Sequence, residues 1–229
     1  MVAKISSELV LDDLKDAFWR VTTTNAKGAS TTKVLSHETY VNMLRKNTIV
    51  RKEAKKHSLG RMPYGYVDCL YGSHGNYEIA VMYPGKVRGV KYYKDTYRVP
   101  YPNTLYTYSV LNGVVQSKHC FAVIDDVITP ETVLYRFPFG NVGSMGSMCY
   151  GNIHLPDCTE LSSIDTLVEL FLSGDVNDDL YHPSDTAKNC KQFELYQFLE
   201  GKKKFPTKIL VKDTEYGVKK EIRFKNIWK

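Results

Sequence analysis

The chain has 229 residues, of which 43% are hydrophobic, and a formal net charge of +6. A chain of this length buries a core without disulfide bonds, and its five cysteines are odd in number and form no CxxC pair. These features exclude a disulfide framework and a zinc-binding pattern, and no cofactor motif is present. No apolar stretch has the form of a signal peptide or membrane helix, so we expect a cytoplasmic protein that does not enter a membrane.

The first part of the chain predicts a small α/β unit. Two β-prone runs, Ala17–Thr22 and Thr31–Leu35, flank a turn-forming Asn-Ala-Lys-Gly segment, which is typical of a hairpin. Apolar residues at helical spacing predict a helix over His37–Arg45, with Ser36 as its N-cap. We therefore assign residues 1–76 to an N-terminal extension with α/β structure.

The middle of the chain predicts an antiparallel β-meander. Several β-prone runs are separated by Gly, Pro or Asn-Gly. The clearest hairpin signal is Asn112-Gly113, because both residue types tolerate the positive φ of a type I′ turn. The predicted strands are Tyr77–Tyr83, Val87–Tyr93, Asn103–Leu111, Val114–Ile124 and Thr132–Phe137.

Helices are expected after these strands. Ser162 or Ser163 can cap a helix with one apolar face, formed by Ile164, Leu167, Val168 and Phe171. A second helix is predicted over Ser184–Leu199, followed by a basic, strand-like tail at residues 201–229. Because strands and helices are segregated along the chain, we predict an α+β domain over residues 77–200.

Between the strands and the helices lies a glycine-rich loop that carries Asn141 and Cys149. Such a loop folds tightly and can bring an amide beside a thiol eight residues away. A thiolate can attack a thioester, and a carboxamide can stabilise the oxyanion that develops. Cys149 is therefore the candidate nucleophile. The alternative is that Cys149 is a small buried hydrophobic residue, which we favour for Cys120, in an apolar strand, and for Cys190, on the predicted second helix.

The motif around Cys149 resembles the active-site segment of ubiquitin-conjugating (E2) enzymes, which places an asparagine eight residues before the catalytic cysteine. The closer resemblance is to prokaryotic E2 family D, which includes protein B of the PRTRC cassettes. The matching residues are Pro138-Phe139-Gly140-Asn141-Val142, Gly146 and Cys149-Tyr150-Gly151. Phe139 and Gly140 occupy the positions of the His-Pro pair of eukaryotic E2 enzymes. The resemblance covers roughly residues 78–180.

This resemblance implies a UBC-like fold and a set of partners. Cys149 would accept a ubiquitin-like protein as a thioester from a ThiF/E1-like activating enzyme, supported by Asn141, and pass it to an amine, such as a lysine of a target protein. The acid that assists the incoming amine has several candidates. They are Asp157, Asp178 and Asp179, with Asp175 also in the same segment.

Two alternative functions remain at this stage. The chain could be a non-catalytic E2-like scaffold, or a cysteine hydrolase of thioester or isopeptide bonds with His154 as its base. Charge is distributed unevenly: Arg45–Lys56 and Lys202–Lys229 are basic, whereas Pro156–Thr186 contains eight acids and no Lys or Arg. We interpret these segments as solvated surface and do not expect a nucleic-acid partner.

Overall fold

The computed structural model describes residues 4–11, 17–25, 27–47, 60–72, 75–214 and 220–228. The chain divides into two compact units, Met1–His57 and Ser58–Lys229. The basic segment Arg45–Lys56 lies largely outside the described residues. Within the described part, no helix is long and apolar enough to cross a membrane.

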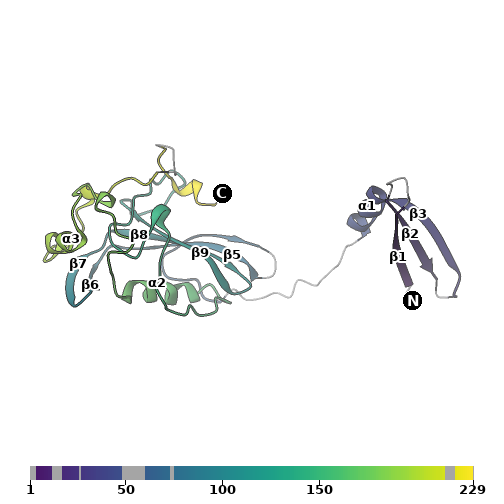
Figure 1. The fold of residues 1–229 in the computed structure, drawn as a ribbon, viewed down its shortest axis with the longest axis horizontal. Helices are drawn as coiled ribbons and strands as arrows, with labels where there is room; N and C mark the ends of the chain where they lie inside the picture. Colours follow the sequence, from purple (N-terminus) through teal and green to yellow (C-terminus); the bar gives the residue numbers. More distant parts are fainter. Residues whose placement is uncertain are drawn as a thin grey trace. The chain divides into compact units, whose positions relative to one another are not determined.

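The first unit is a three-stranded antiparallel sheet with one helix (Figure 1). The predicted hairpin and helix are confirmed, and Ser36 caps the helix because its Oγ accepts a hydrogen bond from the Thr39 N–H at 3.2 Å. Trp19 stacks on Tyr40 with ring centroids 4.2 Å apart. A first strand, not predicted, pairs with the hairpin. The elements are β1 (Lys4–Leu11), β2 (Ala17–Thr24), β3 (Ser30–Ser36) and α1 (His37–Asn47).

The second unit is built on a four-stranded antiparallel sheet in the order β4-β5-β8-β9. Asn112 and Gly113 have φ of 52° and 80°, so the predicted turn between β8 and β9 is confirmed. Between β5 and β8 the chain leaves the sheet to form the separate hairpin β6–β7. The strands are β4 (Tyr66–Tyr71), β5 (Tyr77–Tyr83), β6 (Val87–Tyr92), β7 (Asp95–Pro100), β8 (Asn103–Leu111) and β9 (Val114–Val123).

β4 falls within the residues assigned from the sequence to the N-terminal extension, yet it pairs with β5 in this sheet. The main sheet is buried on both faces, which explains why β5 is apolar almost throughout. Ile79 and Val81 belong to the larger core cluster, whereas Ala80, between them, belongs to a smaller cluster on the opposite face. The helices cover the first face, and Ile222 and Phe224 from the end of the chain cover the second.

α2 (Ser163–Ser173) is the first predicted helix, and its four expected core residues are buried. It runs along one face of the sheet (Figure 1). The second helix, α3, is only Gln192–Leu199, so the predicted start at Ser184 is wrong. Residues Pro183–Asp185 form a 3₁₀ turn instead, and Asn189 has a positive φ of 48°, which a continuous α-helix does not allow. Cys190 therefore precedes the helix.

Two further strand predictions are wrong. Thr132–Phe137 and the described residues of the tail contain only isolated bridges, such as Tyr135 with Lys212 and Val133 with Arg223. These bridges nevertheless hold the tail against the second core cluster. The α+β class and the UBC-like order of sheet, loop and helices are confirmed.

Candidate functional site

The loop between Asn141 and Cys149 closes on itself through backbone hydrogen bonds. The Cys149 N–H donates to the Asn141 carbonyl at 2.8 Å, and the Gly143 N–H donates to the Ser147 carbonyl at 2.8 Å. A 3₁₀ turn over Ser144–Gly146 forms the tip. The predicted proximity of the two residues is therefore achieved by their backbones, at the neck of the loop.

The loop is also fixed to strand β9. The Met148 N–H donates to the Lys118 carbonyl at 3.1 Å, and Ser147 forms a bridge with His119. At Gly146, φ is +73°, and a Cβ there would lie 2.5 Å from the Cys120 carbonyl oxygen. Only glycine allows this close approach of the loop to β9. The position of Cys149 is thus determined by the sheet.

Cys149 is the exposed cysteine of the five. Its Sγ accepts a hydrogen bond from the Gly151 N–H at 3.4 Å. Burial raises the pKa of the Cys158 thiol to about 11 and also raises the pKa of the Cys120 thiol well above its usual value. The interpretation of Cys149 as a buried hydrophobic residue is wrong, whereas for Cys120 it is confirmed.

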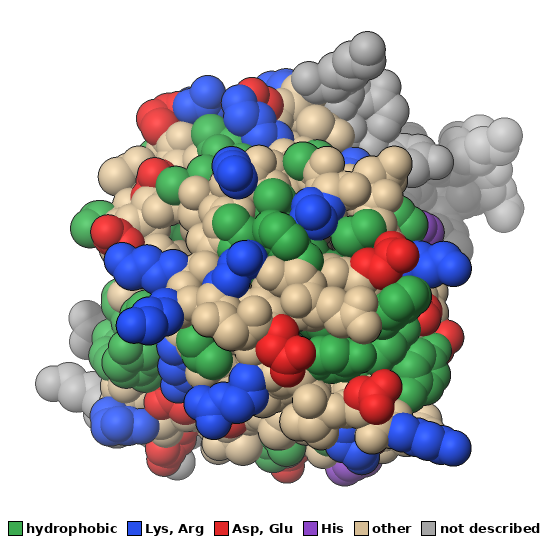
Figure 2. All heavy atoms as spheres, turned by 90° about the vertical axis from the view of Figure 1, so that its left-hand side faces the viewer, with side chains coloured by type: hydrophobic (Ala, Val, Ile, Leu, Met, Phe, Trp, Pro, Cys, Tyr) green, Lys and Arg blue, Asp and Glu red, His purple; other side chains and the backbone are tan. Residues whose placement is uncertain are grey.

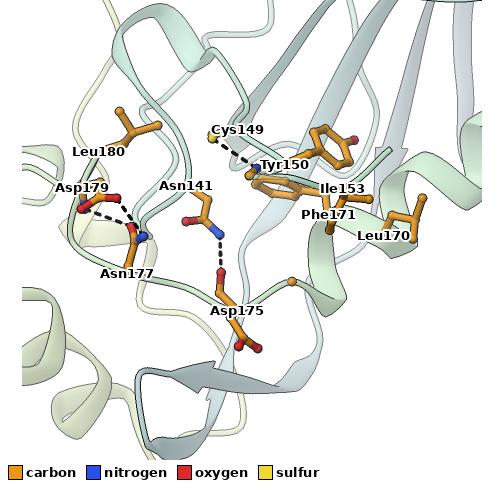
Figure 3. A pocket seen from close by; sticks show the side chains of 12 residues that line it. Asn141, Cys149, Tyr150, Ile153, Leu170, Phe171, Asp175, Asn177, Asp179 and Leu180 are labelled. Atoms are coloured by element: carbon orange, nitrogen blue, oxygen red, sulfur yellow. Dashed lines mark hydrogen bonds between the residues drawn. The ribbon is translucent and has the colours of Figure 1, made fainter. Parts of the chain in front are cut away.

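Cys149 lies on a groove of about 410 Å³, which we call the Cys149 groove (Figure 3). Its wall combines apolar side chains from α2 with two carboxylates, and among the described residues no Lys, Arg or His lines it. Asp175 is paired with Lys91, so the negative charge that this groove offers to a cationic ligand comes mainly from Asp179. The lining residues are Asn141, Cys149, Tyr150, Gly151, Ile153, Leu170, Phe171, Gly174, Asp175, Asn177, Asp179 and Leu180.

The Asn141 side chain does not approach the thiol. Its Nδ2 donates to the Asp175 carbonyl at 2.8 Å, and in Figure 3 the carboxamide points toward Asp175. Asn141 itself has a φ of 64°, a left-handed conformation that asparagine tolerates better than most residues. In this geometry the amide supports the opposite wall of the groove. Of the two roles predicted for Asn141, loop support and oxyanion stabilisation, the contacts favour the first.

That wall is the segment Gly174–Asp179, which we call the acidic strap. Its backbone is held at two further points: the Val176 N–H donates to the Lys91 carbonyl of β6 at 2.8 Å, and Gln192 Nε2 donates to the Asn177 carbonyl at 3.2 Å. Gln192 is completely buried. Sequence reasoning missed Gln192, because nothing local to α3 indicates a partner fifteen residues upstream.

The candidate acids lie in different places. Asp179 lines the groove, and its carboxylate accepts from Asn177 Nδ2 at 2.9 Å. Asp178 is not among the lining residues, and its carboxylate accepts a hydrogen bond from the Tyr92 hydroxyl at 2.7 Å; burial, and then this bond, raise the pKa of Tyr92. Asp157 is exposed and lies outside the groove lining. The structure thus brings Asp179 together with Cys149, along with Asp175, whose carboxylate pairs with Lys91 at 2.6 Å.

His154, the base of the hydrolase alternative, is exposed and does not line the groove. Among the described residues, no side chain forms a hydrogen bond that orients its ring. A Cys-His arrangement needs both the approach to sulfur and the orientation. The described geometry therefore gives the hydrolase alternative no support.

Comparisons with known proteins agree with the motif. A sequence model of prokaryotic E2 family D matches residues 72–213, which include the main sheet from β5 onward, the Cys149 loop, α2 and α3. Searches of curated proteins and of solved structures gave no match. The family match spans more than half of the chain and all residues of the groove, and the chain therefore belongs to prokaryotic E2 family D.

Proposed function

We propose that this chain is an E2-like carrier that accepts a ubiquitin-like protein from a ThiF/E1-like enzyme on Cys149 and transfers it to an amine. The observation that carries the proposal is the position of Cys149, an exposed thiol at the edge of the groove on a loop anchored to β9. Family membership supports a transferase role in general.

The first step is a thiol–thioester exchange (transthioesterification). The Cys149 thiolate attacks the thioester carbonyl on the activating enzyme, the new carbon–sulfur bond forms, and the enzyme's cysteine leaves as a thiolate. No external base is required at the moment of attack, because a thiol is partly ionised near neutral pH. The Gly151 N–H, already directed at the sulfur, stabilises charge there before attack and again when Cys149 leaves.

The second step is aminolysis. A lysine that enters as an ammonium ion first loses one proton to water. The neutral amine then attacks the Cys149 thioester, an amide bond forms, Cys149 leaves as a thiolate, and the nitrogen loses a second proton. Asp179 lies on the same groove as Cys149 and is held by Asn177, so it is our candidate for orienting the amine and accepting that proton. No basic side chain in the described part of the chain lines the groove, which favours entry of a cationic lysine.

The test of the first step uses the activating enzyme and the ubiquitin-like protein of the same organism, with ATP. We expect an adduct that a thiol reductant cleaves and that is absent from Cys149→Ala. Cys149→Ser should form an adduct that resists the reductant, and Cys69→Ala, which alters a half-buried thiol outside the groove, should charge normally. Binding of both partners without an adduct would establish the scaffold instead, and removal of a pre-formed conjugate would establish the hydrolase.

The test of the second step starts from purified thioester and adds lysine. Asp179→Asn should slow discharge by roughly a hundredfold, within the usual contribution of a positioned acid or base, and should leave charging unchanged. Asp157→Asn is the matched control, because it removes the same charge from an exposed position outside the groove lining. Equal discharge rates for the two variants would exclude Asp179 from the step.

A further inference from the structure

Beside the acidic strap, the second unit carries a surface of opposite charge, which we call the basic face. It is formed by the tip of the β6–β7 hairpin and by the residues around α3. Residues 94–98 and 188–204 together hold seven Lys or Arg and only three Asp or Glu. Figure 2 shows Lys and Arg side chains spread over this side, with fewer acids between them. The seven are Lys94, Arg98, Lys188, Lys191, Lys202, Lys203 and Lys204, all exposed.

The two parts of this face form one rigid surface. Helix α3 packs against β7, and Tyr196 of α3 stacks on Tyr97 of β7 with ring centroids 5.3 Å apart. Tyr92 of β6 meets the Tyr196 ring edge to face at 5.4 Å. The basic side chains are therefore presented by a packed framework, which lowers the entropy lost when a partner binds.

The charge of the basic face is not neutralised by neighbouring side chains. In the described part of the chain, none of the seven residues pairs with a carboxylate, whereas the adjacent Arg88 and Lys91 do. Lys188 and Lys202 instead both lie over the Phe198 ring, at 3.9 and 4.6 Å from its centroid. Holding two ammonium groups at one ring concentrates positive charge, and an acidic partner would offset that repulsion.

The acidic strap connects the Cys149 groove with the elements that carry the basic face. Its residues Asp175 and Asp179 line the Cys149 groove, while its backbone is bonded to Lys91 of β6 and to Gln192 of α3, the elements that carry the basic face. The two proposed chemical steps have partners of different kinds: a lysine amine, which the negative groove attracts, and a protein that delivers the acyl group. We propose that the basic face docks an acidic surface of the activating enzyme during charging of Cys149.

This inference rests on the proposed function and adds a partner surface to it. A protein partner fits the basic face better than a nucleic acid does. Asp95, Glu194 and Glu200 are interspersed among its Lys and Arg residues and would repel a phosphate backbone. Long-range attraction between opposite charges raises the rate of encounter. Charging needs such an encounter between two proteins, whereas discharge to lysine does not.

The experiment compares two double variants with the same change in net charge. Lys202→Glu/Lys203→Glu alters the basic face, and Lys27→Glu/Lys33→Glu alters two exposed lysines of the first unit. We measure the initial rate of charging against chain concentration, and the discharge of purified thioester to lysine. The face variant should raise KM for charging about tenfold with kcat and discharge unchanged. The control should match the wild type, and salt should raise the wild-type KM more than that of the face variant.

Several results would overturn the docking proposal while leaving the carrier function intact. One is normal charging with equal KM values for wild type and face variant; another is an equal rise in KM for the control, which would reflect net charge alone. If the wild type binds a short DNA duplex, the face variant does not, and KM for charging is unchanged, the basic face is a nucleic-acid surface instead. If wild-type Cys149 forms no thioester at all, the carrier function itself is wrong.

Discussion

Replacing Gly146 by alanine tests whether the packing of the loop on β9 positions Cys149. At φ +73° an alanine is strained by about 1–2 kcal/mol, and its Cβ would lie 2.5 Å from the Cys120 carbonyl oxygen and 2.8 Å from the Phe121 ring. Because backbone and a buried ring cannot move freely, this overpacking adds about 1–3 kcal/mol. Gly201→Ala is the matched control, since Gly201 has a φ of +76° with open space around it. The free energy of unfolding should therefore differ by about 1–3 kcal/mol between the two variants.

The two-unit architecture determines the assay. The chain has two tryptophans, Trp19 in the first unit and Trp228 beside Phe224 in the second. In a Trp19→Phe background, tryptophan fluorescence reports urea unfolding of the second unit alone, which avoids applying a single two-state transition to both units. Charging of Gly146→Ala should also slow by roughly ten- to a hundredfold, because a displaced loop misplaces the thiol. If both variants lose equal stability and charge at wild-type rates, the loop does not pack on β9 as described.

Three other predictions address the surroundings of the groove. Gln192→Leu removes the donor to the Asn177 carbonyl and should cost about 1–3 kcal/mol in unfolding free energy, with slower discharge to lysine; a normal discharge rate would show that the strap keeps its position without this bond. Brief alkylation of the folded protein, read by peptide mass spectrometry, should label Cys149 first and leave Cys120 and Cys158 unlabelled until denaturation. Burial raises the pKa of the Asp213 carboxyl above its unfolded value near 3.8, so its contribution to stability is present below that pH and is lost as pH rises through the folded pKa. Titrating wild type and Asp213→Asn from acid to neutral pH should therefore shift the difference in unfolding free energy in favour of the variant.

Elements with strong local signals could be predicted from the sequence. Strands β5, β8 and β9 are rich in β-branched and aromatic residues and are bounded by recognisable turns, and α2 has a regular apolar face. The turn of the β6–β7 hairpin was missed because Tyr93, with a φ of 52°, occupies a position where glycine or asparagine is the usual signal. The tail was misread because Ile222 and Phe224, in a basic segment, are buried by contacts with distant strands.

The same distinction between local signals and long-range contacts applies to the candidate site. The meeting of Asn141 and Cys149 follows from a glycine-rich loop and an offset of eight residues, which is local information, and the structure places both on the groove. By contrast, the Asn141 amide donates to Asp175, thirty-four residues away, and the donor to the Asn177 carbonyl is Gln192 of α3. Choosing among the acids of Pro156–Thr186 likewise needed the path of the chain after α2. Spacing in the sequence therefore identified the candidate nucleophile, whereas the wall opposite it required tertiary structure.

These long-range contacts change how the Asn141 amide should be interpreted. A carboxamide that donates to the Asp175 carbonyl at 2.8 Å cannot use the same N–H to hold an oxyanion without releasing the strap. Donors nearer the sulfur, such as the Gly151 N–H at 3.4 Å, require no such exchange. The strap is also held by Lys91 and Gln192, so losing the Asn141 bond alone would loosen one end of it. If Asn141 stabilises the oxyanion, replacing it by alanine would impair both steps, because each passes through an oxyanion. If Asn141 instead supports the strap, its loss would impair mainly the discharge to lysine in which we propose that Asp179 takes part. The ratio of charging to discharge rates in Asn141→Ala therefore distinguishes the two roles.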